Sequence, residues 1–454
     1  MELIHYLSYK VLEKKDLPQS INKKYNHGYA KLKINFRVRC VSCRVELEPN
    51  DPSLRCPKCK SQLIVDYDYE EIKEKVREIF NGTVSTIWKY RPLLPLIDDK
   101  NIVSIGEGGT KILRANRLES YLDVGRLFLK IEAWNPTGSQ KDRQLSLSIS
   151  RGLELGYKVS ITSSSGNVGA SVAAYSSKAS ILPLIMVPNI APEEKLVQIT
   201  MYGGVIIMID TPSNIEVASL VEKLVEKLKI YDVVTAGIHN PYTVEGGRTI
   251  SYEIYEQLGS LPDVVVAPVG GGGLIGSIWK GFKELEILGL INRDELPRMV
   301  GVQATGCAPF VKAIKENWDL EKVFSNPWGK IDTICNAIAD TIPLDARFAL
   351  PAIRESGGTA IDVSDEETLL AEYKLSSMEG VFAEPSSSTT IAAVRKLRED
   401  RLIDRDETVL CMITGTGFKD LRSISKIKGK FVKLPPDFES VLNYLRTEII
   451  SKKN

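Results

Sequence analysis

The sequence predicts an α/β fold built on parallel sheets, preceded by a small cysteine-rich part. From about residue 102 onward, short apolar segments alternate with longer segments that have the periodicity of helices, which is typical of strand–helix–strand units. Polar and glycine-rich motifs follow directly after several apolar segments, where ligands collect in such folds. Four cysteines in two closely spaced pairs lie before this region.

Seven short apolar runs are predicted to be buried strands, because a strand of a parallel sheet is covered on both faces. They span residues 127–131, 159–162, 184–187, 205–209, 264–268, 300–304 and 408–413. The clearest helices are expected at 142–155, 214–228 and 366–378. A charged helical segment is expected at 69–80, and a peripheral strand followed by a helix is expected at 426–454.

Size and composition indicate a globular protein of two or three domains. The chain has 454 residues, of which 43% are hydrophobic and 26% are charged, and its net charge is +1. This balance gives no general basic field for nucleic acid or for an anionic membrane surface. We find no apolar run long enough to span a membrane, and the charged N-terminus does not resemble a signal peptide, so we expect a cytoplasmic protein with no membrane partner.

The paired cysteines predict a metal site. Cys40 and Cys43 form one Cys-x2-Cys pair and Cys56 and Cys59 form another, which in a reducing compartment favours metal binding over disulfides. The pattern resembles a zinc ribbon, in which four thiolates close the coordination sphere of a structural Zn ion. Four unliganded thiols are the alternative, and they would leave this spacing unexplained. The ribbon is basic, but we expect a solvated or packing face there rather than a nucleic-acid site.

The first chemical motif is Asn-Pro-Thr-Gly-Ser-Gln-Lys-Asp-Arg at 135–143, between a predicted strand and a predicted helix. Pro136 and Gly138 predict a turn, so Lys141 opens the helix. The positive partial charge of a helix N-terminus favours the neutral, nucleophilic form of a lysine, which suits a bond with an aldehyde cofactor. A solvated lysine in a first helical turn is the alternative for this motif taken alone.

Two further motifs place backbone N–H groups at the starts of helices. Ser-Ser-Ser-Gly-Asn-Val-Gly at 163–169 follows a predicted strand and offers a seat for a carboxylate or a phosphate. The second motif is a run of glycines that allows the backbone to wrap an anion, and it consists of Gly270, Gly271, Gly272 and Gly273. This run matches neither the dinucleotide fingerprint nor a Walker loop. A plain helix cap and a tight turn are the structural alternatives.

The fourth motif, Thr-Gly-Thr-Gly-Phe-Lys-Asp at 414–420, follows the last predicted strand. Thr414 would present a hydroxyl at the carboxyl edge of the sheet, although an ordinary strand-end turn would have the same composition. Together the four motifs supply a lysine, a polar partner for a ring, a cradle for an anion and a second hydroxyl. That combination points to a small-molecule site.

This set of motifs resembles the fold-type II pyridoxal-phosphate (PLP) enzymes, and among them the threonine synthases. The lysine motif at 135–143 carries the resemblance most specifically. Other segments similar to that family are Gly-Glu-Gly-Gly-Thr at 106–110, Asn-Pro-Tyr-Thr-Val-Glu-Gly at 240–246, Trp-Lys-Gly-Phe at 279–282 and Glu-Pro-Ser at 384–386. The resemblance covers residues 84–425 of the chain.

The resemblance implies that Lys141 carries PLP as a Schiff base and later takes the α-proton of an amino-acid substrate. The implied cofactor contacts are Asn167 at the ring oxygen, Gly270 to Gly273 at the phosphate, and Thr414 at the pyridine nitrogen. The implied substrate contacts are Ser164, Ser165, Gly166 and Asn240. The implied reaction converts O-phosphohomoserine and water to threonine and phosphate.

The resemblance also implies a division into domains. A zinc-ribbon extension at 1–66 would precede a large PLP-binding domain, formed by 84–135 and 250–430, and a small mobile domain at 136–249. Both α/β domains would be doubly wound around parallel sheets, with a peripheral segment at 431–454. A homodimer is expected on the same ground.

Several positions depart from the threonine synthase pattern where that family is expected to hold the substrate phosphate. The substituted positions are Val168, Thr243, Gly271 and Leu274. A phosphate dianion needs charge-assisted donors, which Arg248 or Lys195 would have to supply. A threonine/serine dehydratase or a β-replacement synthase of the same fold is therefore a second hypothesis.

A third hypothesis belongs to another class, that of an inactive scaffold or nucleic-acid-binding regulator built on the enzyme fold. The basic N-terminal part favours it. The intact lysine motif, glycine run and Thr414 argue against it.

Overall fold

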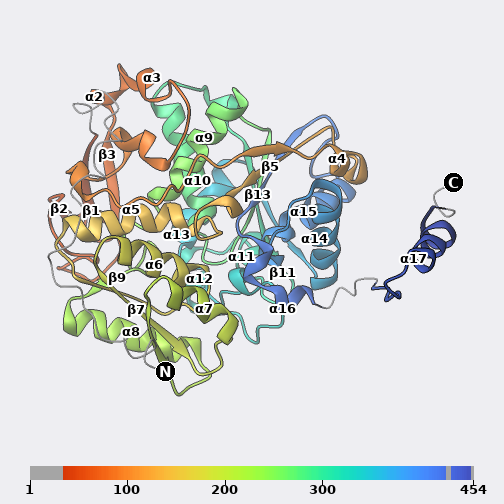
Figure 1. The fold of residues 1–454 in the computed structure, drawn as a ribbon. Helices are drawn as coiled ribbons and strands as arrows, with labels where there is room; N and C mark the ends of the chain where they lie inside the picture. The colour runs from red at the N-terminus through yellow and green to blue at the C-terminus, as the bar shows by residue number, and fades with distance from the viewer. Residues whose placement is uncertain (1–33, 426–430, 451–454) are drawn as a thin grey trace. The chain divides into compact units, whose positions relative to one another are not determined.

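The computed structural model describes residues 34–425 and 431–450, and it divides into two compact units, Met1–Lys419 and Asp420–Asn454 (Figure 1). The described part of the first unit contains three sheets. No helix in the described ranges is long and apolar enough to cross a membrane.

The largest sheet has six strands in the order β12-β11-β10-β13-β5-β4. Their bounds are β4 Ile112–Arg114, β5 Arg126–Ile131, β10 Val264–Pro268, β11 Arg298–Ala304, β12 Thr359–Val363 and β13 Thr408–Ile413. All neighbours pair in parallel except β4, which is antiparallel to β5. Since β13 lies between β10 and β5, the motifs that follow these three strands meet at one edge of the sheet.

Helices cover both faces of this sheet. One face carries α9 (Thr249–Leu258), α10 (Gly273–Ile287), α11 (Pro309–Lys315), α12 (Leu320–Ser325) and α13 (Ala346–Glu355), and the other carries α4 (Asn116–Leu122), α14 (Asp365–Glu379) and α15 (Pro385–Glu399). Successive residues of β10 point to opposite faces: Val265 packs with the first set of helices, and Val264 and Val266 pack with the second. This arrangement confirms the predicted doubly wound α/β fold.

The second parallel sheet has four strands in the order β8-β7-β6-β9. Its strands are β6 Val159–Thr162, β7 Leu182–Pro188, β8 Val205–Ile209 and β9 Tyr231–Asp232, and its helices are α5 (Lys141–Glu154), α6 (Asn167–Lys178), α7 (Glu193–Met201) and α8 (Asn214–Leu228). On β7, Ile185 and Val187 share a core with α5 and α6, whereas Met186 packs with α8. Both faces of this sheet are therefore covered as well.

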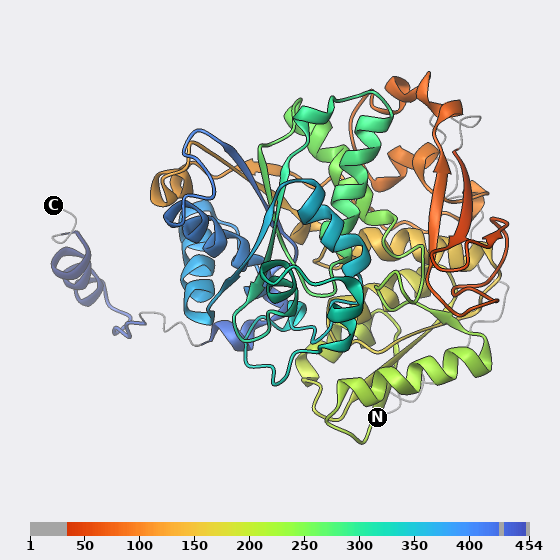
Figure 2. The same ribbon diagram turned by 180° about the vertical axis from the view of Figure 1, so that it is seen from behind.

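The N-terminal sheet is antiparallel, in the order β2-β1-β3. It consists of β1 Asn35–Cys40, β2 Glu46–Leu47 and β3 Leu63–Asp68. Phe36, Val38 and Val65 belong to the same hydrophobic core as α5 and α6. The cysteine-rich part is therefore packed against the rest of the first unit (Figure 2).

All seven predicted strands and the three clearest helices are present. β6, β8, β10, β13 and α8 have the predicted bounds, and the others differ by at most two residues at either end. The apolar runs do not predict the remaining strands, β1, β2, β3, β4, β9 and β12, because each is short or interrupted by polar residues such as Asp362.

Two predicted helical or strand segments differ from the structure. The helix expected at 69–80 is two single turns, α2 (Glu70–Lys73) and α3 (Val76–Ile79), since the backbone at Lys75 (φ −107°, ψ 3°) is not helical. The strand expected near the end is absent from residues 431–437, and 426–430 lie outside the described residues.

The second unit contains α16 (Leu421–Ile424), α17 (Phe438–Tyr444) and η9 (Leu445–Ile450). The Asp437 side chain caps α17 by accepting a hydrogen bond from the Ser440 N–H at 2.8 Å. The remaining short turns of helix are η2 (Ile87–Leu93), η3 (Asp99–Asn101), η4 (Glu132–Trp134), η5 (Gly246–Arg248), η6 (Arg293–Glu295), η7 (Asn336–Ile338) and η8 (Gly417–Lys419).

Gly276→Ala is expected to lower the melting temperature by a few degrees, because α10 packs closely on α13. A Cβ atom on Gly276 would lie 2.4 Å from the Cβ of Phe348. The helical propensity gained by alanine, ~1 kcal/mol, is smaller than the ~1–3 kcal/mol that overpacking costs. Thermal unfolding measures the difference, with Gly329→Ala as the control, because a Cβ there meets no atom within 4 Å. Equal stability of both variants would contradict the close packing.

Candidate functional site

The loop before Lys141 is held at the end of β13. The N–H of Gln140 donates to the carbonyl of Thr414 at 2.8 Å, and the N–H of Thr416 donates to the carbonyl of Gly138 at 3.0 Å. Gly138 adopts a φ of +88°, which favours glycine. The two motifs, far apart in the sequence, thus form one surface, and Lys141 is the first residue of α5.

Asn135 and Asp142 fix the ends of this loop. The side-chain oxygen of Asn135 accepts the N–H of Gly108 at 2.9 Å, and its amide donates to Glu132 at 2.8 Å. The Asp142 carboxylate accepts the N–H of Thr137 at 2.7 Å and its hydroxyl at 2.6 Å. Burial raises the pKa of Asp142 to about 6, although these hydrogen bonds act in the opposite direction.

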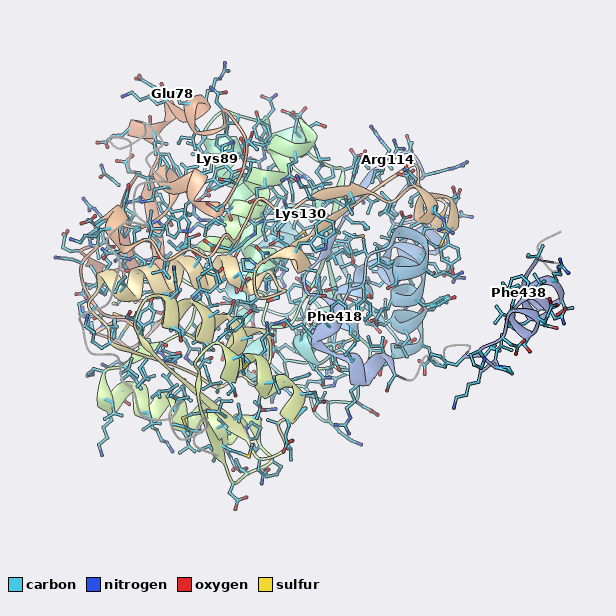
Figure 3. The ribbon with its side chains drawn as sticks, viewed as in Figure 1. Glu78, Lys89, Arg114, Lys130, Phe418 and Phe438 are labelled. Carbon is cyan, nitrogen blue, oxygen red and sulfur yellow. The ribbon has the colours of Figure 1, made fainter. Side chains whose placement is uncertain are left out.

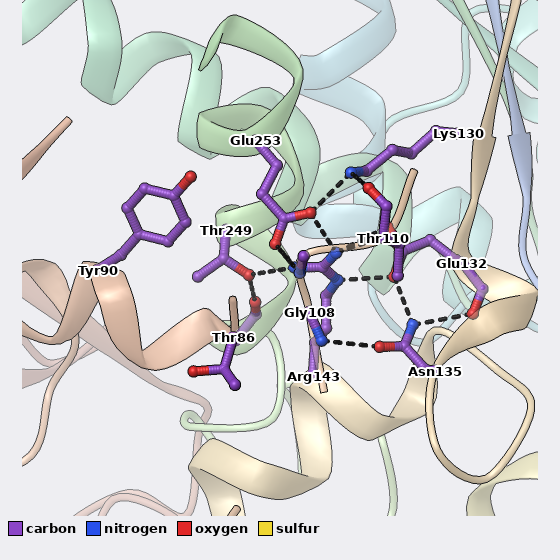
Figure 4. Close-up of polar contacts among 12 residues, drawn as sticks. Thr86, Tyr90, Gly108, Thr110, Lys130, Glu132, Asn135, Arg143, Thr249 and Glu253 are labelled. Atoms are coloured by element: carbon purple, nitrogen blue, oxygen red, sulfur yellow. Dashed lines mark hydrogen bonds and ion pairs between the residues drawn. The ribbon is translucent and has the colours of Figure 1, made fainter. Parts of the chain in front are cut away.

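Arg143 lies at the centre of a buried ion-pair network (Figure 4). Its guanidinium donates to Glu132 at 2.6 Å and to Glu253 of α9 at 2.6 Å. Lys130 of β5, which is labelled in Figure 3, donates to Glu253 at 2.7 Å. All four side chains are fully buried, and their two positive and two negative charges balance. Removing one partner of such a network costs about 3–5 kcal/mol, because an unpaired charge remains in the interior.

The amine of Lys141 faces a set of polar side chains from three segments. Its Nζ donates to the hydroxyl of Thr235 at 3.0 Å. Burial lowers the pKa of this amine, whereas the carboxylates of Asp340, Asp345 and Glu384 act in the opposite direction. The desolvation favours the neutral amine that a nucleophile or a base requires.

The glycine run leads into the N-terminus of α10, and a side chain would be crowded at three of its four positions, Gly270, Gly272 and Gly273. Gly272 has a φ of +98°. A Cβ on Gly270 would lie 2.6 Å from the Oδ2 of Asp340, and a Cβ on Gly273 would lie 2.5 Å from the Oδ2 of Asp345. A bare backbone at the start of a long helix is a suitable cradle for a phosphate group.

Two acidic residues beside this run were missed by sequence reasoning. Asp345 is fully buried, and its Oδ1 accepts the N–H of Gly237 at 2.7 Å, while its Oδ2 has no hydrogen-bond partner among the described residues. Burial raises the pKa of Asp345 to about 7. The Asp340 side chain is accessible to solvent, yet the protein surrounds it closely enough that loss of hydration raises its pKa. Both lie in or next to the irregular stretch before α13, where no periodic pattern draws attention to them.

The serine-rich loop before α6 is shaped by Gly169, at which a Cβ would lie 2.0 Å from the carbonyl oxygen of Ser164. Ser164, Ser165 and Gly166 are half-buried. The Asn167 amide donates to the Glu384 carboxylate at 3.1 Å, and the N–H of Glu384 donates to the Gly415 carbonyl at 3.0 Å. This loop therefore lies beside the end of β13 too.

Thr414 is nearly buried, and its hydroxyl lies 2.8 Å from that of Ser387 in α15. The same Ser387 oxygen accepts the N–H groups of Thr414 at 3.0 Å and Gly415 at 2.9 Å. The hydroxyl of Thr414 is thus held at the carboxyl edge of the sheet, as its motif predicts.

The predicted substrate-binding residues divide into two groups. Ser164, Ser165 and Gly166 lie at the N-terminus of α6, beside the other motifs. Asn240 is fully buried, and its amide donates to the Asp232 carbonyl at 2.8 Å and to Ser148 at 3.3 Å. Its contact with substrate stays a prediction, and its position favours a role in ordering the 232–243 turn.

The four paired cysteines come together in one cluster. Their sulfur atoms all lie within 4.8 Å of one another, with 3.5 Å between Cys40 and Cys59 and 3.5 Å between Cys43 and Cys56. Metal–sulfur bonds of about 2.3 Å in a tetrahedron place neighbouring sulfurs about 3.8 Å apart, so the cluster fits a metal ion. Burial would raise the pKa of the Cys40 thiol, but the N–H groups of Cys43 and Ser42 help to lower it to about 6.

Known proteins resemble this chain over most of its length. Residues 103–415 match the model of the family described as pyridoxal-phosphate dependent enzyme. The chain is 39% identical to the threonine synthase of Methanocaldococcus jannaschii over 90% of this chain and 99% of that protein. It is also 39% identical to the threonine synthase of Methanosarcina acetivorans, over 86% of this chain and 93% of that protein.

Solved structures of low sequence identity share the fold of this chain, and they show nothing beyond the fold. Threonine deaminase isoform 2 from Solanum lycopersicum superposes with a TM-score of 0.61 and 20% identity, covering 85% of this chain and 99% of that one. Maize serine racemase superposes with a TM-score of 0.58 and 21% identity, covering 76% of this chain and 94% of the racemase chain.

Asp345→Asn is expected to stabilise the protein, and more so at pH 8 than at pH 5. The carboxyl pKa is about 7 in the folded chain against an ordinary value of 3.8, so the folded state binds this proton more tightly and loses stability as pH rises from about 4 to 7. Asparagine does not titrate, so the melting-temperature difference between variant and parent should grow over this interval.

Asp362→Asn is the control, because the hydrogen bond from Lys315 holds the pKa of Asp362 below its ordinary value despite partial burial. That variant should melt lower than the parent by a constant amount from pH 5 to pH 8. A constant difference for Asp345→Asn as well would contradict the raised pKa.

Proposed function

The chain belongs to the family of pyridoxal-phosphate dependent enzymes, and from this premise we propose that it is a threonine synthase-like lyase, which converts O-phosphohomoserine and water to threonine and phosphate. The observation that carries the proposal is the 39% identity to a threonine synthase over almost the whole of both chains. The glycine cradle and the desolvated lysine at the same sheet edge support it.

The residues at this edge fit the cofactor. Lys141 would carry it, the backbone of Gly270 to Gly273 would hold its phosphate, and Asn167 and Thr414 would contact its ring. When bound, PLP supplies an electron sink for the bond broken at the α-carbon of the substrate. A neutral Thr414 hydroxyl does not hold a proton on the ring nitrogen as a carboxylate would, which suits elimination and replacement better than transamination.

Lys141 would act as the base for the α-proton. Its desolvated amine has a lowered pKa, so a larger fraction is neutral and able to accept a proton. The carboxylates of Asp340 and Asp345 lie close enough to favour its protonated form afterwards. The substrate carboxylate would bind Ser164, Ser165 and Gly166, at the positive end of α6.

Fewer side chains are placed to bind the phosphate of the substrate. This favours a dehydratase or β-replacement synthase as the second candidate. Thr243 is fully buried and donates its hydroxyl to the Asn240 carbonyl at 2.9 Å. Arg248 is also fully buried, and its guanidinium is paired with Glu245 and Glu284. Both side chains are thus engaged with protein groups, and Asp340 adds negative charge near the glycine run.

Three further features belong to the same proposal. The cysteine cluster would hold a structural Zn ion, since its thiolates would fill all four positions. The enzyme would work in the cytoplasm as a homodimer. The domain at 136–249 would move against the one formed by 84–135 and 250–430.

The direct test is the release of phosphate and threonine from O-phosphohomoserine by the PLP-loaded protein. Equal amounts of both products are expected, with a loss of at least 10³-fold in Lys141→Ala, which lacks the proposed base and cofactor attachment. Lys158→Ala is the matched control, because this lysine is exposed and lies beyond the end of α5. If neither product forms while serine or threonine yields ammonia and a 2-oxo acid, the dehydratase replaces the threonine synthase as the function.

A further inference from the structure

The second cysteine pair lies at the tip of a turn that reaches the segment beside Lys141. Arg55 and Gln62 pair across this turn in an isolated antiparallel bridge, with Cys56 and Cys59 between them. We call residues 55–62 the knuckle. The geometry of the knuckle therefore determines where the side chains of Arg55 and Gln62 point.

Arg55 connects the knuckle to the turn after β9. Its Nη2 lies 2.9 Å from the Nδ1 of His239 and donates to Glu222 of α8 at 2.8 Å. The same His239 nitrogen lies 3.3 Å from the carboxylate of Asp232. The guanidinium thus links α8 to the segment that follows β9.

Gln62 makes the second connection, and it is almost fully buried. Its side-chain oxygen accepts a hydrogen bond from the Nε of Arg347 in α13 at 3.1 Å. A Cβ on Gly237 would lie 3.2 Å from the Nε2 of Gln62 and 3.2 Å from the Oδ1 of Asp345. Gln62 and Asp345 therefore both lie beside Gly237: Asp345 accepts its N–H, and the Gln62 Nε2 packs against it without a hydrogen-bond partner among the described residues.

The segment held in this way faces the amine of Lys141. Thr235, two residues before Gly237, accepts the hydrogen bond from Lys141 at 3.0 Å. The N–H of Gly237 donates to Asp345, whose charge acts on the same amine. A shift of residues 235–239 would thus change both the hydrogen bond and the electrostatic environment of Lys141.

The N-terminal sheet is anchored firmly enough to serve as a fixed support for the knuckle. Tyr67 of β3 donates its hydroxyl to Glu245 at 2.5 Å and accepts a hydrogen bond from Arg248 at 2.7 Å. Lys280 of α10 donates to the Val65 carbonyl at 3.2 Å. The sheet also shares its apolar core with α5, the helix that begins at Lys141.

We propose that Arg55 and Gln62 are positioning residues for Lys141. The knuckle, held in shape by Cys56 and Cys59, aligns the Lys141 amine through its contacts with residues 235–239. The proposal rests on the proposed role of Lys141 as the cofactor lysine. A metal bound by Cys56 and Cys59 of the knuckle together with Cys40 and Cys43 would hold both side chains in place, and its loss would release them.

The test uses the PLP-loaded full chain and the variants Gln62→Ala and Arg55→Ala. Each is expected to lower kcat about tenfold or more with little change in KM, since a small misplacement of a catalytic group costs this much. Each should also shift the pH midpoint of the visible absorption of the bound cofactor, because the surroundings of the Lys141 amine change. Arg55→Lys, which keeps the charge, should restore part of the loss.

Arg37→Ala is the control for a general effect on the N-terminal sheet, because Arg37 is exposed and pairs only with Glu46 on that sheet in the described structure. A chelator under reducing conditions, which would strip a metal from the four cysteines, should reproduce the spectral shift expected for Gln62→Ala. If Gln62→Ala does not fold, Arg55→Ala decides, since its side chain is 40% exposed and its loss leaves no cavity.

Unchanged spectra and kcat in both folded variants would overturn the proposal. A Lys141→Ala protein that keeps the cofactor absorption of the parent would instead overturn the proposed role of Lys141. Failure of the proposal for Arg55 and Gln62 can therefore be told apart from failure of the proposed role of Lys141.

Discussion

The buried guanidinium of Arg143 is the interaction on which the site depends. It lies two residues after Lys141 in the first turn of α5, and it joins the end of β5, through Glu132, to α9, through Glu253. Lys130 completes the balance of charge. Because these groups are paired only in one arrangement, the start of α5 cannot shift without leaving a charge unpaired in the interior. The position of Lys141 is thus determined by ionic bonds on one side and by the backbone of β13 on the other.

The order of the large sheet explains why motifs distant in sequence meet. β13 lies between β5 and β10, so Thr414 is flanked by the lysine loop and the glycine run. Carboxylates are also concentrated there: Asp340, Asp345 and Glu384 all act on the Lys141 amine. The site therefore combines an anion cradle of backbone N–H groups with acidic side chains, which limits where a second phosphate, that of the substrate, can bind.

The sequence alone predicts most of the sheets and the four motifs, because apolar runs such as 264–268 and glycine runs are local signals. It does not predict Thr235, Asp340 or Asp345, which lie in irregular segments and reach Lys141 only through the tertiary fold. Nor does it reveal that Arg248, a candidate phosphate ligand in sequence, is paired with Glu284 and Tyr67 in the interior. Long-range pairing of charges leaves no periodic pattern in a single sequence. The contact of the knuckle with Gly237 escapes prediction for the same reason.

The measurement that tests this account most directly is the identity of the lysine that carries the cofactor. Borohydride reduction of the PLP-loaded protein, followed by digestion and mass spectrometry, fixes the cofactor to its lysine and locates it. The label is expected on Lys141. Burial also lowers the pKa of the amines of Lys130 and Lys419, so a label on either of them, or the absence of any labelled lysine, would contradict this expectation.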